Sequence, residues 1–183
     1  MPVSEATYEQ VALEDPEGQW ELVCGRLRSK PGMTTEHNAA QRALGRILDR
    51  QLDERQSVVA QNSARLRIST GTYYVPDLCV IPIAAERRLR ETRPRRLEVY
   101  ETPMPLVVEV WSPSTGEYDV DNKLPEYQWR GDREIWRIHP YERTLTAWRR
   151  QPDGTYVETL YREATIEPVA LPGVRIAIEP LFE

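Results

Sequence analysis

The sequence predicts an α+β fold, with a central mixed β-sheet flanked by helices. Helical and strand patterns follow one another irregularly: helix, strand, helix, several strands, helix, then strands to the end. A strongly amphipathic segment is followed by short β-branched or aromatic segments that Gly, Pro or polar residues separate. Because no clear linker divides the 183 residues, we expect a single domain spanning residues 1–183.

The composition, 40% hydrophobic and 29% charged, is typical of a soluble globular protein. No apolar run approaches the roughly 20 residues of a membrane helix, and the polar, acidic start does not resemble a secretory signal. We therefore expect a cytoplasmic protein without a membrane partner. A net charge of −5 argues against non-specific coating of nucleic acid. Two cysteines and two histidines, spread along the chain, make a zinc site improbable, so oxygen atoms would hold any metal.

The N-terminal part predicts a short helix, a strand with a turn, and a long helix. Thr7 and Gln10 have capping-box spacing, which predicts a helix over residues 8–14. Residues 20–28 (WELVCGRLR) predict a strand that bends at Gly25. The long helix is predicted at about residues 35–55. Its apolar residues recur at spacings of three and four: Ala40, Ala43, Leu44, Ile47, Leu48 and Leu52.

Strand patterns dominate the remaining chain. The predicted strands are 57–63, 64–70, 72–81, 105–111, 133–140, 143–151, 155–163 and 173–182, the last four forming a C-terminal β-rich segment. Residues 119–130 predict a helix that contains Pro125. Proline is costly inside a helix. Either the helix begins near Asp121, which leaves Pro125 in the first turn, or it is kinked.

Residues 86–96 (ERRLRETRPRR) are locally basic, with six arginines against two glutamates. One interpretation is a solvated loop or short helix between two strands. The other is a patch that contacts nucleic-acid phosphates, because arginine binds phosphate oxygens in a bidentate manner. The candidate phosphate-contacting residues are Arg87, Arg88, Arg90, Arg93, Arg95 and Arg96.

Two carboxylates stand in apolar strand patterns. Glu109 lies at the centre of LVVEVW, where an unpaired charge would be costly unless a cation or ion pair compensates it. Asp77 follows Pro76 and precedes the apolar run LCVI, and a proline there indicates an edge or bend. A buried salt bridge would explain either acid alone. If both converge on one point, their hard oxygen atoms suit Mg²⁺ or Mn²⁺.

Asp119, Lys123 and Tyr127 have i, i+4, i+8 spacing and so share one face of the following helix. If this helix packs across the sheet, the ammonium of Lys123 can point toward the carboxylate pair. The alternative is an ordinary surface pair between Asp119 and Lys123.

Together these motifs resemble the Uma-two family of bacterial proteins, in the PD-(D/E)XK, or restriction-endonuclease-like, superfamily. The resemblance extends from about residue 5 to 183. It rests on Pro76-Asp77, on Glu109 within VVEVWSPST, on Asp119, Lys123 and Tyr127, on WELVCGRL, on His37 at the start of the long helix, on GDREIWRIHP and on LPGVRIAIEPLF.

The resemblance implies a nuclease core in which Asp77 and Glu109 bind a divalent metal and Lys123 assists catalysis. The superfamily places its lysine two residues after the second acid, where this chain has Trp111. Lys123, on the next helix, looks like the replacement of that lysine. Glu21, in the family-like WELV motif, either completes the metal site or forms a structural ion pair, which we favour.

His37 shares an apolar stripe with Ala40, Leu44 and Leu48, so a core histidine is favoured over a ligand. The predicted function is a Mg²⁺- or Mn²⁺-dependent endonuclease that hydrolyses DNA, and a homodimer would allow both strands to be cut. The alternative is a non-catalytic homodimeric binding or scaffold protein with the same fold. A hydrolase with another substrate also fits, because a fold does not determine the substrate.

Overall fold

The computed structural model describes residues 2–183, except the side chains of Glu117 and Val120. The helical segments are α1 (Glu5–Glu14), η1 (Pro16–Gly18), α2 (Thr35–Gln51), α3 (Ile83–Thr92), α4 (Gly116–Tyr118), η2 (Asp119–Lys123), α5 (Leu124–Arg130) and η3 (Glu179–Phe182). The strands are β1 (Trp20–Val23), β2 (Arg26–Ser29), β3 (Ser57–Gln61), β4 (Arg65–Ser69), β5 (Thr72–Tyr74), β6 (Leu78–Pro82), β7 (Val99–Tyr100), β8 (Leu106–Val110), β9 (Glu134–His139), β10 (Thr144–Arg150), β11 (Tyr156–Tyr161), β12 (Thr165–Ile166) and β13 (Ile176–Ala177).

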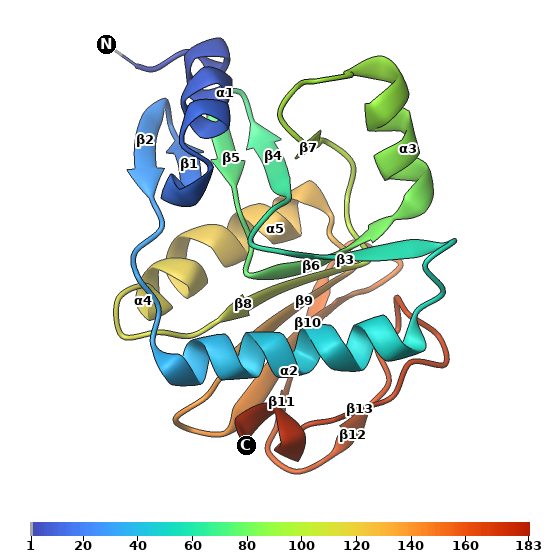
Figure 1. Cartoon of the computed structure of the whole chain (residues 1–183). Helices are drawn as coiled ribbons and strands as arrows, with labels where there is room; N and C mark the ends of the chain where they lie inside the picture. Colours follow the sequence, from blue (N-terminus) through green and yellow to red (C-terminus); the bar gives the residue numbers. More distant parts are fainter. Residues whose placement is uncertain (1) are drawn as a thin grey trace.

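The α+β class is confirmed, but the strands form two mixed sheets and a small pair rather than one sheet. The five-stranded sheet has the order β2-β1-β5-β4-β7, and the six-stranded sheet has the order β11-β10-β9-β8-β6-β3 (Figure 1). Each contains one parallel pair, β4 with β7 and β8 with β9. The predicted strand 72–81 is divided between the sheets, because β5 ends at Tyr74 and β6 begins at Leu78. The bend expected at Pro76 therefore carries the chain from one sheet to the other.

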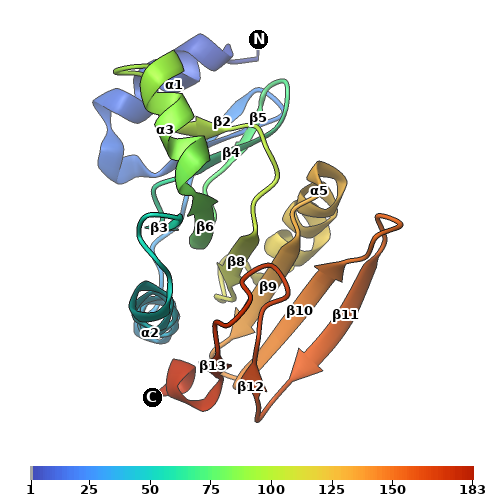
Figure 2. The same ribbon diagram turned by 90° about the vertical axis from the view of Figure 1, so that its right-hand side faces the viewer.

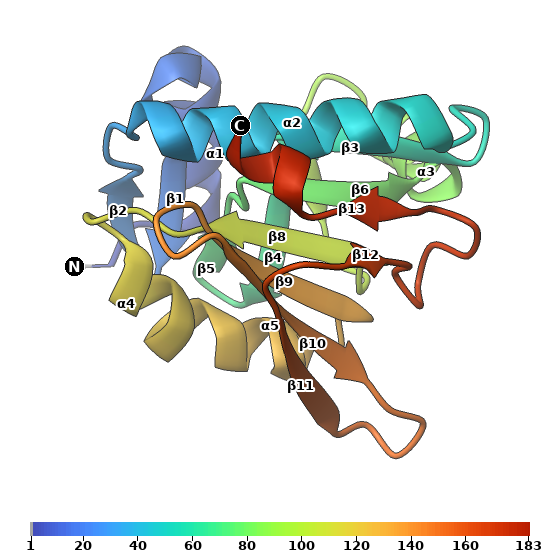
Figure 3. The same cartoon turned by 90° about the horizontal axis from the view of Figure 1, so that it is seen from below.

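The C-terminal strands mostly extend the main sheet instead of forming a separate layer. Strands β9, β10 and β11 continue the six-stranded sheet away from the N-terminal strands (Figure 2). The predicted strand 173–182 is wrong for most of its length, because only Ile176 and Ala177 pair with β12 before η3 begins. The segment η3 lies along α2 (Figure 3).

Strand β8 is central and buried on both faces, as its apolar pattern predicted. Val108 and Val110 pack on α2 residues such as Leu44, in the larger core cluster. Val107 faces the opposite cluster, which includes Tyr127 of α5. Successive side chains of a strand point to opposite faces, so Glu109 shares the face of Val107. Its carboxylate is thereby directed to the side where α4, η2 and α5 lie.

Two helix boundaries differ from the predictions. The first helix begins at Glu5, because the Ser4 hydroxyl accepts a hydrogen bond from the Thr7 backbone N–H and caps it, so Thr7 lies in the first turn. Helix α2 ends at Gln51 rather than near residue 55. Among residues 2–183, no helix has both the length and the apolar character needed to cross a bilayer.

The N-terminal helix is joined to the basic segment by Glu9. The carboxylate of Glu9 accepts hydrogen bonds from the guanidinium of Arg96 at 2.7 and 2.6 Å and from the Leu97 backbone N–H at 2.8 Å. Arg93 also lies 3.4 Å from it. The hydrogen bonds from Arg96 are the main cause of a lowered pKa of Glu9. Two of the six candidate arginines thus have a structural role.

We predict that Glu9→Gln lowers the free energy of unfolding by about 1–2 kcal/mol at neutral pH, because it weakens the hydrogen bonds with Arg96. This value is kept small because solvent screens the exposed guanidinium of Arg96. A carboxylate with a lowered folded-state pKa stabilises the fold above its unfolded pKa, and this contribution disappears as the pH falls through the folded pKa. The difference between wild type and variant should therefore shrink on acidification to below about pH 4. Urea denaturation at several pH values measures it. Glu14→Gln, on the exposed side of α1, is the control, and a pH-independent difference would contradict the prediction.

Candidate active site

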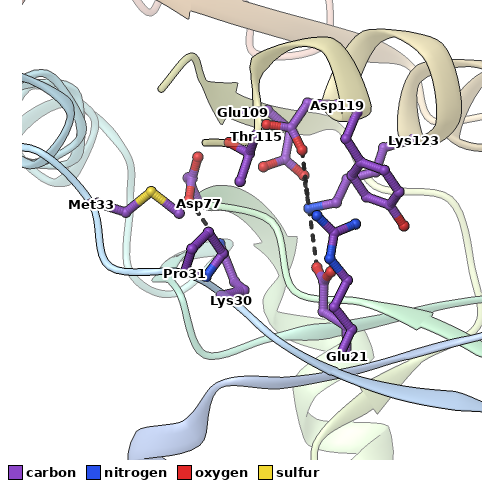
Figure 4. Close-up of a pocket in the computed structure, with 11 residues that line it drawn as sticks. Glu21, Lys30, Pro31, Met33, Asp77, Glu109, Thr115, Asp119 and Lys123 are labelled. Carbon is purple, nitrogen blue, oxygen red and sulfur yellow. Dashed lines mark hydrogen bonds and ion pairs between the residues drawn. The ribbon is translucent and has the colours of Figure 1, made fainter. Parts of the chain in front are cut away.

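Asp77 and Glu109 lie opposite each other on neighbouring strands. Strands β6 and β8 are antiparallel with Leu78 opposite Val108, and continuing this register by one residue places Asp77 opposite Glu109. Residues that face each other in this way have Cβ atoms about 4.5–5.5 Å apart on one face. Both carboxylates line one pocket (Figure 4). The structure thus brings the two predicted acids together, and metal binding by them stays a prediction.

Every oxygen of the Asp77 carboxylate has a protein partner. Its Oδ1 is 2.8 Å from the ammonium of Lys30. Its Oδ2 accepts a hydrogen bond from the Val110 backbone N–H at 2.8 Å and lies 3.0 Å from Nε2 of His37. Because an ionised carboxylate only accepts hydrogen bonds, His37 carries its proton on Nε2. His37 is fully buried, so the prediction of a core histidine agrees with its position, although it also orients Asp77.

Glu109 is held by two side chains from the continuous helical segment that α4, η2 and α5 form. The Oε1 atom of Glu109 lies 3.2 Å from the ammonium of Lys123 and accepts a 2.7 Å hydrogen bond from the hydroxyl of Tyr127. Asp119 Oδ1 is 3.5 Å from the same ammonium. The predicted helix face therefore does point into the site. The surface pair considered as an alternative is wrong, because the Lys123 side chain is only 4% exposed.

Glu21 connects the site to the five-stranded sheet. Its Oε1 lies 3.0 Å from the ammonium of Lys123 and accepts a 2.9 Å hydrogen bond from the Val75 backbone N–H. The structural ion pair favoured for Glu21 is present. Lys123 consequently bridges β1, β8 and the helical segment, and the site lies where the two sheets meet.

The helical segment avoids the expected conflict with Pro125 by changing its winding. Between α4 and α5, residues 119–123 form a π-helical turn in which the Leu124 backbone N–H bonds to the Asp119 carbonyl. Pro125 then stands in the first turn of α5, where no N–H donor is needed. π-Turns are frequent at functional sites. This turn contains both Asp119 and Lys123, so it sets how they face Glu109.

Trp111, at the position of the expected lysine, packs away from the carboxylates. Its ring stacks on His139 with centroids 4.3 Å apart, and Tyr141 meets it edge-on at 5.6 Å. A Cβ atom at Gly116 would lie 1.9 Å from the indole nitrogen, so only glycine permits this contact. Trp111 thus fixes the start of α4, and through α4 it positions the helical segment.

Lys30 and Arg28, two further cations of this pocket, were missed by sequence reasoning. Lys30 reaches Asp77 from the irregular segment between β2 and α2, and the guanidinium of Arg28 lies 3.6 Å over the ring of Tyr118. Composition carries a signal for Lys30: the chain has 24 basic residues, and only Lys30 and Lys123 are lysines. Both lysines lie in this pocket.

The basic segment is a short helix, α3, followed by a turn, as the first interpretation stated. Arg90 pairs with Glu86, and Arg93 and Arg96 pair with Glu9. The remaining candidates, Arg87, Arg88 and Arg95, are exposed. None of the six lines the carboxylate pocket as described for residues 2–183.

The pocket contains more carboxyl groups than cationic side chains. Its four acids are Glu21, Asp77, Glu109 and Asp119, and its cations are Arg28, Lys30 and Lys123. Burial and the negative charges of Asp119 and Asp77 raise the pKa of Glu109 to about 8. Burial also raises the pKa of Asp119. A cation bound beside Glu109 would favour the ionised form of this carboxyl group.

Asp77 and Lys123 stay ionised at neutral pH. Burial raises the pKa of Asp77, but the charges and hydrogen bonds of Lys30 and His37 together outweigh it and bring this pKa well below its usual range. Burial lowers the pKa of Lys123, yet Glu109 and Glu21 raise it to well above the usual lysine value. Lys123 is therefore a permanent cation at neutral pH.

The donor set fits a hard divalent cation held by few protein ligands. Among residues 2–183, no three His, Cys, Asp or Glu side chains are grouped to enclose a metal by themselves. Mg²⁺ commonly uses one or two carboxylates and completes its shell with water and substrate phosphate. Asp77 and Glu109 supply carboxylates of this kind. The pocket has about 10 Å³ of free volume, roughly the space that one water molecule needs.

Comparison with known proteins agrees with this fold. The family model described as "Uma2: Putative restriction endonuclease" matches residues 6–179. A crystal structure of "a putative nuclease belonging to DUF820 from Anabaena variabilis ATCC 29413" superposes with a TM-score of 0.74, at 19% sequence identity. The alignment covers 91% of this chain and 90% of that one, which establishes the restriction-endonuclease-like fold. The search of curated proteins gave no match.

We predict that Lys123→Met lowers the free energy of unfolding by about 3–5 kcal/mol, because three buried carboxylates lose their shared cation. Urea denaturation of the purified variant measures this. The double variant Lys123→Met/Glu109→Gln should recover part of the loss, since a buried Glu109 without Lys123 must take up a proton, whereas glutamine is already neutral. If Lys123→Met has the stability of wild type, Lys123 does not hold the two sheets and the helical segment together.

Proposed function

Because this chain belongs to the Uma2 family, we propose that it is a metal-dependent endonuclease that hydrolyses DNA phosphodiester bonds. The observation that carries the proposal is the opposition of Asp77 and Glu109 across β6 and β8, with the ammonium of Lys123 3.2 Å from Glu109. Acids on adjacent strands beside a lysine are what the family resemblance implies for a nuclease. Burying these charges at the junction of two sheets is costly, and catalysis would explain why the chain retains them.

Asp77 and Glu109 are the residues that would hold Mg²⁺ or Mn²⁺. Such an ion, when bound, lowers the pKa of a coordinated water molecule and neutralises charge that grows on the phosphate. Val110 and His37 fix the orientation of the Asp77 carboxylate through its Oδ2. Tyr127 does the same for Glu109 through its Oε1. The chain thus presents both acids in fixed orientations, which is what preorganised catalysis requires.

Lys123 would act as an electrostatic group rather than as a base. Its pKa is raised well above the usual lysine value, so it holds its proton at neutral pH. An ammonium in this state can bind a phosphate oxygen and stabilise the charge that develops in the transition state. The opening in which it lies is narrow, so a bound phosphate would have to displace part of the present ion-pair network.

The DNA backbone would approach from outside the pocket. Arg87, Arg88 and Arg95 are exposed and free to contact phosphates, whereas Arg90, Arg93 and Arg96 are engaged in ion pairs. We propose these three exposed arginines as the remaining phosphate contacts of the basic segment. A homodimer would present two sites to the two strands of a duplex.

One observation favours the alternative of a non-catalytic binding protein with the same fold. Lys30 and Lys123 already compensate Asp77 and Glu109, so the pocket is electrostatically supported by its own side chains. A protein that had lost catalysis could keep such ion pairs for stability alone. Mn²⁺ distinguishes the two functions, because only a metal site gains thermal stability from the free ion.

We predict that Asp77→Asn and Glu109→Gln each reduce Mg²⁺- or Mn²⁺-dependent cleavage of duplex DNA by at least about 100-fold, equivalent to about 3 kcal/mol. Each should also abolish the rise in melting temperature that Mn²⁺ produces in wild type. Plasmid nicking and differential scanning fluorimetry provide the two measurements.

Asp53→Asn is a matched control, because Asp53 follows the C-terminal end of α2 while His37 lies in its first turn. At 1.5 Å per residue, His37 and Gln51, the last residue of α2, are about 21 Å apart along the helix. The control should cleave DNA and bind Mn²⁺ as wild type does. Wild-type protein that neither cleaves DNA nor gains stability from Mn²⁺ would exclude the endonuclease and leave the binding protein.

A further inference from the structure

The ammonium of Lys30 occupies a site built from three oxygen atoms. Its Nζ lies 2.8 Å from Asp77 Oδ1, 2.9 Å from Asn62 Oδ1 and 2.9 Å from the Val75 carbonyl oxygen. An ammonium has three N–H donors, so each finds one acceptor. The Lys30 side chain is 6% exposed. Carboxylate, amide and backbone carbonyl oxygens are also the ligands that proteins offer to hard metal cations. The ammonium of Lys30 thus occupies a set of oxygen atoms of the kind that could bind a free metal cation.

The position of Lys30 conflicts with a metal ion on Asp77. Val110 and His37 already use Oδ2, so Oδ1 is the oxygen that a metal would share with Lys30. A Mg²⁺–oxygen distance is about 2.1 Å. Added to the 2.8 Å from Oδ1 to Nζ, it leaves the two cations at most about 5 Å apart. Two like charges this close in a buried pocket repel strongly.

The segment that carries Lys30 is irregular and is open on one side at Gly32. Residues 30–34 have no helical or strand structure, and they connect β2 to α2. A Cβ atom at Gly32 would meet no atom within 4 Å, so this segment is open on that side. Figure 4 shows Lys30 and Pro31 at the Asp77 end of the pocket, apart from Lys123. Withdrawal of Lys30 would break none of the ion pairs that Lys123 makes.

We propose that Lys30 is an internal competitor of the divalent cation: it fills the Asp77 end of the pocket in the metal-free protein, and the metal displaces it from Oδ1. This inference rests on the proposed function, because it concerns the same site. In the metal-free protein, Lys30 then compensates the negative charge of Asp77. Occupancy of the site would then depend on the concentration of free divalent ion.

Lys30→Met tests the competition, because methionine keeps the length of the side chain and removes its charge. We expect the variant to bind Mn²⁺ at least about tenfold more tightly than wild type, since the repelling ammonium is absent. Isothermal titration calorimetry measures the affinity. Arg28→Met is the matched control: it removes a positive charge from the same pocket, where Arg28 stacks on Tyr118, and should change the affinity much less. An unchanged or weaker affinity of Lys30→Met, or an equal effect of Arg28→Met, would overturn the proposal.

A second measurement uses the wild-type chain and so does not depend on whether the variant folds. Because Lys30 and Lys123 are the only lysines, acylation followed by peptide mass spectrometry reports on each one separately. Mn²⁺ should accelerate the labelling of Lys30 in wild type and leave it unchanged in Asp77→Asn. If Lys30 is labelled no faster when wild type is saturated with Mn²⁺, the proposal is wrong.

The two proposals can fail separately. If wild type cleaves DNA while Lys30→Met shows unchanged Mn²⁺ affinity, the endonuclease stands and the competition does not. If Lys30→Met binds Mn²⁺ more tightly and Lys30 is released by the ion, but neither protein cleaves DNA, the competition stands and the endonuclease does not. Absence of Mn²⁺ binding to both proteins would overturn the competition as well.

Discussion

The interior of this protein depends on compensating four carboxylates that meet in one pocket. Each is almost fully buried, and an unpaired buried carboxylate is among the most costly groups in a folded protein. Lys123 forms ion pairs with three of them, and Lys30 forms an ion pair with the fourth. Since these groups come from both sheets, from the helical segment and from the β2–α2 connection, the same ion pairs that neutralise the pocket also hold its walls together. Stability and the candidate chemistry are therefore properties of one network.

The geometry of the helical segment follows from the need to bring Lys123 to this point. The packing of Trp111 against Gly116 starts α4 close to the end of β8. The π-turn that follows places Asp119 and Lys123 on the inner face, and Pro125 then opens a regular helix without losing a donor. An uninterrupted α-helix would need an N–H that Pro125 lacks. Trp111, at the position where the resemblance places a lysine, secures the helical segment from which Lys123 reaches Glu109.

The buried acids could be predicted from sequence, because a charge in an apolar strand demands an explanation that does not depend on knowing the fold. Lys123 followed from its spacing with Asp119 and Tyr127 and from the family resemblance. The division of the strands into two sheets could not be predicted, since the pattern of a strand does not identify its partners. Lys30 lies in an irregular segment, where no periodicity gives a side chain its direction. Its contact with Asp77 joins positions 47 residues apart. It depends on the pairing of β1 with β5, the strand that precedes Asp77.

The use of lysine itself is informative in a chain that otherwise relies on arginine. Ion pairs elsewhere, such as those of Arg67 and Arg149, use the guanidinium, whose planar fork binds carboxylates in fixed geometry. An ammonium is a compact charge with three rotatable donors, which suits the three oxygens around Lys30 and the three carboxylates around Lys123. It is also more strongly hydrated than a guanidinium, so water stabilises it better once it leaves the pocket. Lysine is therefore the cation that can both fill an oxygen-lined site and give it up. An arginine at position 30 would need a wider cavity and would lose more of its fixed hydrogen bonds on release. Lysine is therefore the better partner for Asp77 under the proposed competition, in which this carboxylate exchanges one cation for another.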